Sequence, residues 1–183
     1  MLYIMRHGQT DWNVKHKMQG HTDIPLNDNG RKMAKDAAEE YKNVHFDICF
    51  CSPLIRAKET AEIFLENRDI PIVTDDRLIE MGFGDYEGVE NSFEIPDCPI
   101  NTLFLEPEKY KDPPGGAESF EELFSRTGEF LREKVYPLLE QDKDVLIVGH
   151  GAMNSSIVCQ VKNIPLKDFW SAGIDNCKLM KLI

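Results

Sequence analysis

Three stretches of the sequence carry residues that could hold and transfer an anionic group. An Arg-His-Gly motif centred on His7 ends the apolar run that opens the chain, and a Gly-His-Gly motif centred on His150 ends the run "DVLIV". Arg56 follows a third apolar run, "FDICFC". Histidine is an effective nucleophile or proton carrier near neutral pH, because much of it is unprotonated there. Arginine offers a planar fork of N–H donors that suits phosphate oxygens. These residue types therefore indicate chemistry on an anionic substrate, if the fold brings them together.

The pattern along the chain alternates between strands and helices. Short apolar runs bounded by turn residues indicate strands, and apolar residues that recur every three or four positions indicate helices. The run "DVLIVG" is apolar almost throughout, which is typical of a central parallel strand buried on both faces. The sequence predicts strands over residues 2–5, 46–51, 71–74, 144–149 and 178–183, and helices over 27–41, 53–66, 119–138 and from about Met153.

This alternation predicts an α/β fold, a three-layer sandwich whose mostly parallel central sheet is flanked by helices. Two of the helix starts carry local signals. Ser52 precedes a proline, and Ser119 opens a Ser-x-x-Glu capping box. In a parallel sheet the carboxyl ends of the strands share one edge, where ligands bind. His7, Arg56 and His150 each follow a predicted strand, so we expect them to meet at that edge.

Four blocks of sequence, in this order, resemble the motifs of one known family. They are "RHGQTDWN", "SPLIRAKETA", "LIEMGFGDYEG" and "VGHG", and each lies just after a predicted strand. The chain resembles the histidine phosphatase superfamily, the phosphoglycerate mutase-like proteins, and in particular its small phosphatase branch. The resemblance extends from Leu2 to about Asn154. It implies a phosphoglycerate mutase-like fold and phosphoryl transfer through a phosphohistidine.

The resemblance also implies a role for the charged residues in these blocks. His7 is expected to be the nucleophile that attacks phosphorus, with its other ring nitrogen held by a backbone carbonyl near Gly8. Arg6 and Arg56 are expected to clamp the phosphoryl oxygens. His150 is expected to contact the transferring group as a cation and to stabilise the transition state.

The third block supplies the acid. Glu80 is expected to protonate the leaving alkoxide and then to activate water. Asp85 and Glu87 in the same block remain alternatives for this role. Arginine and histidine supply the positive charge that Mg²⁺ supplies in other phosphoryl-transfer enzymes, so neither a metal nor another cofactor is implied. The other positions expected to contact phosphate or substrate are Thr10, Asn13, Gln19, Gly20 and Gly151.

We expect one domain over residues 1–183, with a cap-like insertion at about 89–115. Residues 89–118 contain no arginine, and they carry seven carboxylates against two lysines. Such a segment would repel a small polyanion, whereas a phosphoglycerate mutase must grip both a carboxylate and a phosphate. Apolar residues of this segment could instead cover a less charged body; they are Ile95, Ile100, Leu103, Phe104 and Tyr110. The sequence therefore favours a phosphatase over a mutase.

The predicted function is metal-independent hydrolysis of a small organic phosphomonoester. Three alternatives stay open: phosphoglycerate mutase-type phosphoryl transfer, an α-ribazole phosphatase, and a catalytically silent binding protein of the same fold. Two positions depart from the family pattern and leave the substrate open. Tyr86 stands where tryptophan is frequent, and Ser155 stands where many members carry arginine.

Charge and cysteine content limit the partners. The net charge of −11 argues against nucleic acid and against anionic membranes, so the expected partner is a small phosphorylated metabolite. The apolar runs are too short for a membrane span, and Arg6 interrupts the first run too early for a signal peptide. Five cysteines, an odd number without metal-type spacing, favour the reducing cytoplasm. The sequence does not indicate an oligomeric state.

Overall fold

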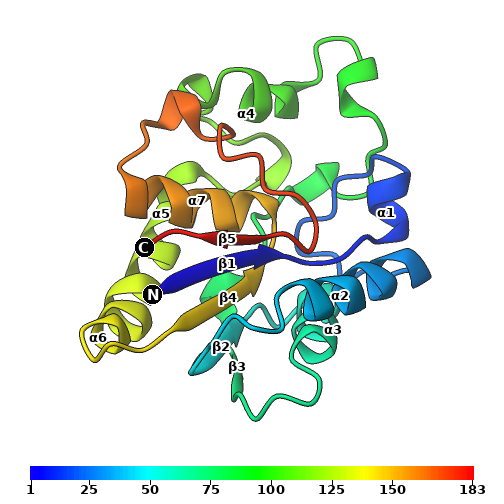
Figure 1. Cartoon of the computed structure of the whole chain (residues 1–183). Helices are drawn as coiled ribbons and strands as arrows, with labels where there is room; N and C mark the ends of the chain where they lie inside the picture. The colour runs from blue at the N-terminus through cyan, green and yellow to red at the C-terminus, as the bar shows by residue number, and fades with distance from the viewer.

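Five strands form one sheet at the centre of the computed structural model, which describes residues 1–183 (Figure 1). The strand order is β3-β2-β4-β1-β5. The first four strands are parallel, and β5 pairs antiparallel with β1 at one edge. Their bounds are β1 (Leu2–Arg6), β2 (Ile48–Cys51), β3 (Ile72–Thr74), β4 (Val145–Gly149) and β5 (Leu179–Lys181).

The position of each strand agrees with its hydrophobic pattern. All five residues of β4 are buried, and β4 is the middle strand of the sheet. The short strand β3 lies at the other edge and is largely exposed. The predicted strands are confirmed, and the last one is the predicted edge strand.

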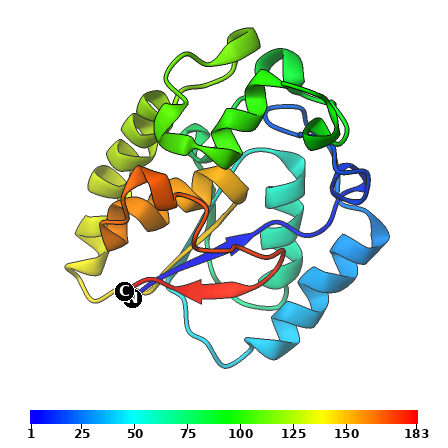
Figure 2. The ribbon, with the colours of Figure 1, turned by 90° about the horizontal axis from the view of Figure 1, so that it is seen from above.

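Helices cover both faces of the sheet, as Figure 2 shows. The side chains of Tyr3 and Met5 pack with those of α2 and α3, whereas Leu2 and Ile4 pack on the other face with those of α5 and α7. The three-layer sandwich is thus confirmed. The helices are α1 (Asp11–Val14), α2 (Asp28–Glu40), α3 (Ile55–Phe64), α4 (Thr102–Leu105), α5 (Phe120–Phe130), α6 (Tyr136–Leu139) and α7 (Gly151–Lys162).

The starts of the helices agree with the sequence signals at α5 but not at α3. Ser119 and Glu122 form the predicted capping box of α5. The predicted cap at Ser52 is wrong, because α3 begins only at Ile55 and its flanking residue, Leu54, makes no side-chain cap. The Ser52 hydroxyl instead accepts a hydrogen bond from the Leu54 N–H at 3.3 Å. It shapes the turn between β2 and the helix. The last helix, α7, begins two residues before the predicted Met153.

The long helix predicted over 119–138 is interrupted. A π-helical turn over Leu131–Val135 separates α5 from α6. Pro137 near the start of α6 explains the break, because proline lacks an N–H and its ring collides with the carbonyl four residues earlier in a regular α-helix. The wider π turn accommodates this proline while Leu131 and Val135 stay buried.

The segment predicted as a cap-like insertion contains α4 and several single 3₁₀ turns. Ile100, Leu103 and Tyr110 of this segment are buried in the same hydrophobic cluster as α5 and α7. The prediction that they cover a substrate is wrong, because they hold the segment to the body of the molecule. The 3₁₀ turns of the chain are Asp76–Leu78, Gly84–Tyr86, Ser92–Glu94, Pro99–Asn101, Pro107–Lys109, Pro114–Gly116 and Leu166–Asp168.

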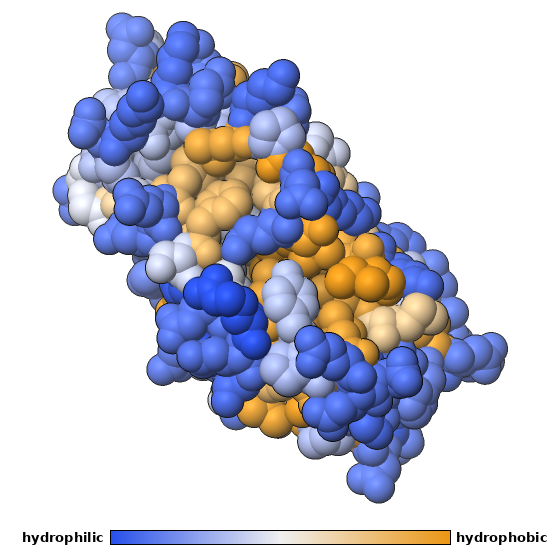
Figure 3. Space-filling view, turned by 90° about the vertical axis from the view of Figure 1, so that its left-hand side faces the viewer, coloured by the Kyte–Doolittle hydropathy of each residue, from blue (hydrophilic) through white to orange (hydrophobic).

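The two termini lie side by side, because β1 and β5 are antiparallel neighbours (Figures 1 and 2). The Leu2 N–H donates to the Ile183 carbonyl at 3.2 Å. Figure 3 shows the face on this side of the molecule, where apolar residues form a band between hydrophilic ones. None of the helices combines the length and the apolar character needed to cross a bilayer. All five cysteines are buried free thiols.

Candidate active site

The two histidine motifs meet where β1 and β4 end. Arg6 lies opposite Gly149 in the register of these parallel strands, so the next residue of each chain segment is a histidine at the same edge. The ring centroids of His7 and His150 are 5.2 Å apart. The expected convergence of the strand ends is therefore present.

His7 is buried and held in one tautomer. Its Nδ1 lies 2.7 Å from the Gly8 carbonyl oxygen, as predicted. Because a carbonyl only accepts, Nδ1 carries the proton and Nε2 keeps its lone pair. Burial lowers the pKa of His7 well below its usual value, and the charges of Arg56 and Arg6 lower it further. The ring is thus unprotonated at neutral pH, with the lone pair of Nε2 available.

Arg6 and Arg56 extend into the same place from β1 and α3. Arg56 is fully buried and donates to the Thr22 and Gly20 carbonyls at 2.9 and 2.7 Å. Arg6 donates to the Ile174 carbonyl at 3.2 Å. The Nε atom of each guanidinium is buried without a partner. Burial lowers the pKa of both arginines, whereas the negative charge of Glu80 opposes that shift. A buried cation with a free donor is a site for an anion.

His150 adds two more unpaired atoms. The side chain is fully buried, and neither ring nitrogen has a hydrogen-bond partner. Burial lowers its pKa well below the usual value, and the charges of Arg56, His7, Arg6 and Arg126 add to the effect. His150 is therefore neutral in the free site, whereas the predicted cation belongs to the state in which it contacts the transferring group. A bound dianion would oppose these positive charges and favour the cation.

Glu80 lies at the N-terminus of α7. One carboxylate oxygen accepts from the N–H groups of Met81 and Met153 at 2.8 and 2.9 Å, and the other accepts from Ala152 at 3.2 Å. Backbone donors at a helix start suit a negative charge. Of the two alternative acids, Asp85 is exposed and Glu87 binds the N–H groups of His21 and Thr22. Glu80 is therefore the carboxylate that shares the cavity with the two arginines.

His7, Arg6, Arg56 and Glu80 form the floor of a cavity of about 460 Å³, and the fully buried His150 lies beneath it, next to His7. Part of the cavity wall is aromatic. Phe104 and Trp170 are stacked with ring centroids 5.3 Å apart, and the Phe93 ring lies 5.6 Å from Phe104. Phe93 is 60 % exposed, so much of its apolar surface is free to meet a ligand. The sequence analysis identified only Phe104 of these three, because no motif marks Phe93 and Trp170 comes from a distant part of the chain.

The predicted substrate contacts line the cavity with two exceptions, Thr10 and the fully buried His150. Asn13, Gln19, Gly20 and Gly151 line the cavity. Thr10 does not, since it is 0 % exposed and its hydroxyl donates to Gln19 at 3.0 Å while accepting from the Asn13 N–H. Thr10 thus caps α1 and orients two residues that do face the cavity.

The acidic character of the 89–118 segment is largely turned away from the cavity. Of its seven carboxylates, only Glu94 lines the wall, beside His16 and Lys17. Lys17 forms an ion pair with Glu90 at 3.7 Å, and Ile95 is exposed to solvent. The expectation that a ring of carboxylates repels polyanions is therefore wrong. The cavity wall combines the three aromatic side chains with polar ones, and it carries no arginine beyond the two at its floor.

One group of side chains in the structure has the spacing of metal ligands, and it lies elsewhere. His45, Asp47 and Asp144 meet just before β2 and β4, at the opposite edge of the sheet from the cavity. The N-terminal amine of Met1 and the Lys143 ammonium already pair with the two carboxylates. These contacts account for the cluster as part of the surface.

Comparison with known proteins agrees with this geometry. Residues 2–183 match the family model of the histidine phosphatase superfamily (branch 1). The uncharacterized phosphatase PhoE of Bacillus subtilis is 38 % identical over 160 residues, which are 86 % of this chain and 75 % of PhoE. A 2,3-bisphosphoglycerate-dependent phosphoglycerate mutase 2 of Gloeobacter violaceus is 29 % identical over 97 % of this chain and 82 % of its own. A mycobacterial glucosyl-3-phosphoglycerate phosphatase, solved in complex with VO3, superposes with a TM-score of 0.80 at 29 % identity, covering 97 % and 90 % of the two chains.

Proposed function

Because this chain belongs to branch 1 of the histidine phosphatase superfamily and is an enzyme of the histidine phosphatase type, we propose that it hydrolyses small phosphomonoesters through a phosphohistidine at His7. One observation carries the proposal. Four buried nitrogens without partners surround the unprotonated His7 ring: the Nε atoms of Arg6 and Arg56, and both ring nitrogens of His150. A phosphoryl group would satisfy these polar atoms, which are otherwise costly to bury.

In the first step, Nε2 of His7 attacks phosphorus, and the bond between phosphorus and the ester oxygen breaks. The leaving oxygen takes a proton from Glu80 as the P–N bond forms. Arg6, Arg56 and a His150 that gains a proton as the dianion binds would stabilise the charge on the equatorial oxygens. In the second step, water gives its proton to Glu80 and attacks phosphorus, and the P–N bond breaks.

The aromatic wall supports a substrate with an apolar or aromatic body. The phosphate would lie on the floor of the cavity, and the body would contact Phe93, Phe104 and Trp170. A mutase must also hold a carboxylate near the reacting centre. Lys17 and His16 at the rim are the only basic side chains of the cavity besides those on its floor. The scarcity of basic side chains for a substrate carboxylate, and not repulsion by acidic residues, therefore favours a phosphatase.

The mutase remains the second candidate, because relatives with that name match most of the chain. Phosphate release and the ratio of 2- to 3-phosphoglycerate, measured in one vessel with 2,3-bisphosphoglycerate present, separate the two. We expect steady phosphate release from a monoester such as naphthyl phosphate and negligible isomerisation. Rapid isomerisation with little free phosphate would identify a mutase.

The nucleophile is tested by His7→Ala. We expect the variant to stay folded and to lose turnover of p-nitrophenyl phosphate, together with the acid-labile phosphoenzyme that the wild-type protein forms in a quenched reaction. His45→Ala is the matched control, because His45 is exposed and lies at the opposite edge of the sheet. Activity within about tenfold of wild type in a folded His7→Ala protein would exclude His7 from the chemistry.

The scheme needs no metal ion, since arginine and histidine supply the positive charge. Turnover is therefore expected to survive prolonged chelation, and vanadate is expected to inhibit by imitating the five-coordinate phosphoryl group. Loss of activity on chelation with recovery on adding Mg²⁺ or Zn²⁺ would contradict the scheme. Five free, buried thiols support the further proposal that the protein works in a reducing compartment such as the cytoplasm.

A further inference from the structure

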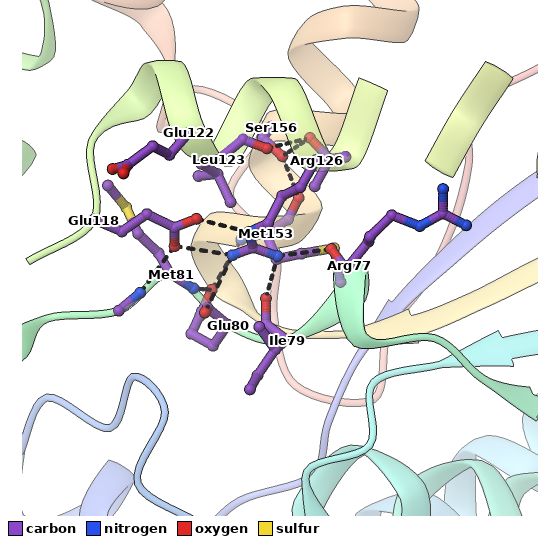
Figure 4. A network of polar contacts seen from close by, with 12 residues as sticks. Arg77, Ile79, Glu80, Met81, Glu118, Glu122, Leu123, Arg126, Met153 and Ser156 are labelled. Atoms are coloured by element: carbon purple, nitrogen blue, oxygen red, sulfur yellow. Dashed lines mark hydrogen bonds and ion pairs between the residues drawn. The ribbon is translucent and has the colours of Figure 1, made fainter. Parts of the chain in front are cut away.

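Arg126 on α5 binds the backbone of the segment that carries Glu80 (Figure 4). Its Nη1 donates to the Arg77 and Ile79 carbonyls at 2.6 and 2.8 Å, and its Nη2 donates to the Glu80 carbonyl at 3.2 Å. One guanidinium thus serves three carbonyls within four residues. We propose that Arg126 is a positioning residue for catalysis, which holds the Glu80 carboxylate in place from behind.

Glu118 completes the clamp on the far side of Glu80. Its carboxylate pairs with Arg126 at 2.6 and 2.9 Å and accepts from the Gly82 N–H at 3.0 Å. The Glu118 N–H donates in turn to the Gly82 carbonyl at 2.8 Å. The ion pair is partly buried, with exposed side-chain fractions of 18 % and 13 %. Backbone on both sides of Glu80 is therefore bound to Arg126 within α5 and to Glu118 just before it.

The segment needs such a clamp because it has no regular structure of its own. Residues 79–83 lie between two 3₁₀ turns, outside any helix or strand. The Ile79 and Glu80 carbonyls have no helical or sheet partner, so they need a donor from elsewhere, which Arg126 provides. An arginine presents several donors in a fixed plane, which fits three neighbouring carbonyls, whereas a lysine presents a point charge.

Hydrogen bonds also connect α5, which carries Arg126, to α7, the helix whose N-terminus binds the Glu80 carboxylate. Next to Arg126, the Thr127 hydroxyl accepts from Ser156 at 3.0 Å and from Gln160 at 2.8 Å, and both of these lie on α7. The N-terminus of α7 binds the carboxylate itself. The Glu80 segment, α5 and α7 are thereby held as one rigid unit. A displacement of about 1 Å in a catalytic group can lower the rate about 10²-fold. Holding Glu80 in a fixed position is therefore expected to keep kcat high.

The inference rests on the proposed function, in which Glu80 donates a proton to the leaving group. It predicts that Arg126→Met slows hydrolysis of an alkyl phosphate by roughly 10- to 100-fold in kcat. The loss for p-nitrophenyl phosphate should be within about threefold, because a good leaving group needs little protonation. KM should change little, since Arg6 and Arg56 keep their contacts. Arg126→Lys should fall between wild type and Arg126→Met.

Arg132→Met is the matched control. Arg132 lies six residues further along, exposed and without an ion pair, and its substitution should leave both substrates unaffected. In a protein that already carries Glu80→Gln, Arg126→Met should lower kcat for the alkyl phosphate by less than about a further threefold, because the two changes remove the same function. Hydrogen exchange provides a readout that does not depend on turnover. Amides of residues 80–82 should exchange faster in Arg126→Met, with those of β4 unchanged.

The outcomes separate the inference from the function on which it rests. Absence of wild-type turnover on every monoester would overturn the proposed function. Suppose that the wild-type protein is active and that Arg126→Met lowers kcat equally for both substrates, with unchanged hydrogen exchange at residues 80–82. This outcome would overturn the role of Arg126 and leave the proposed function in place. The role of Arg126 would also be overturned if the loss of kcat in the double variant equalled the product of the losses in the two single variants.

Discussion

His7 and His150 are buried side by side near two arginines, and burial together with these neighbours determines the charge of each imidazole. Burial and the arginine charges lower the pKa of both rings well below the usual 6.5. A nucleophile with a lowered pKa stays unprotonated as the solution becomes acidic. The acid side of the pH profile therefore reports directly on this environment.

We expect the acid limb of kcat/KM for p-nitrophenyl phosphate, corrected for the ionisation of the substrate, to lie below pH 6.5. The sign follows from the folded-state pKa. As the pH falls through 6.5, a free imidazole gains its proton, whereas His7 in the folded protein does not. Initial rates over a pH series with a stability check at each point provide the measurement. A limb at or above pH 7 would show that the arginine charges do not act on His7 as described.

At the scale of single residues, the sequence was sufficient to predict which side chains meet, but not how deeply each of them is buried. His7, Arg56 and His150 could be predicted to converge because each follows a parallel strand. The complete burial of His150 and the internal position of Thr10 could not be predicted. Both arise from neighbours far away in the sequence.

At the scale of elements, a close backbone contact connects the His7 loop to α2. A Cβ on Gly30 would overlap the Gln9 carbonyl oxygen, and a Cβ on Gly8 would lie 2.5 Å from the Gly30 carbonyl oxygen. Asn27 caps α2 and accepts from the Gly30 N–H at 2.8 Å. The start of α2 therefore sets the path of the loop that follows the nucleophile, and both glycines are needed for the approach.

Gly30→Ala is expected to lower the free energy of unfolding by about 1–3 kcal/mol, because backbone must move to accept the methyl group. It should also lower kcat, since the displaced loop carries His7. Gly128→Ala is the matched control. It too adds a methyl group within a helix, but its Cβ would meet the ends of two flexible side chains and no backbone: Gln160 at 2.5 Å and Arg132 at 3.3 Å. Denaturant unfolding of both variants should show a clear loss for Gly30→Ala alone; equal stabilities would contradict the contact.

The elements themselves were largely predictable, because apolar periodicity depends on local sequence. The start of α3 and the π turn after α5 were not. Ser52-Pro resembles a helix start, yet the chain needs three more residues to turn from β2 into the helix axis. The break before α6 required the exact register of Pro137 against the preceding carbonyls, which a periodic pattern does not resolve.

At the scale of the whole molecule, buried thiols are expected to make the stability of the fold decrease at alkaline pH. Burial raises the pKa of Cys51 to about 11, with a further contribution from Glu62, and burial raises that of Cys177 to about 12. Burial also raises the pKa of Cys159 to about 11, with a contribution from Asp168. These groups stay protonated in the folded protein after the unfolded chain has begun to lose its protons.

Because the folded-state pKa is raised above the usual 9.0, the stabilisation is complete below pH 9 and is lost as the pH rises toward 11 or 12. We expect Tm to fall between about pH 8 and about pH 10.5, as seen by calorimetry under reducing conditions. Cys51→Ala should show a shallower decline than wild type over this interval, even if its Tm at pH 8 is lower. An identical slope in both proteins would exclude a contribution from Cys51.

The order of the strands sets the timing of assembly during synthesis. β1 is the first strand to leave the ribosome, yet its two sheet neighbours are β4 and β5, the last two. The Arg6 carbonyl accepts from the Cys177 N–H, the Arg6 guanidinium donates to Ile174, and the His7 carbonyl accepts from Asn176 at 2.5 Å. In a nascent chain, Arg6 and His7 therefore lack these hydrogen bonds through almost the whole of translation. Such late pairing of distant segments folds slowly and exposes strand edges meanwhile. Under the proposed function, a chain that lacks the segment from Ile174 onward is therefore expected to have no turnover, because Arg6 and His7 lack these contacts.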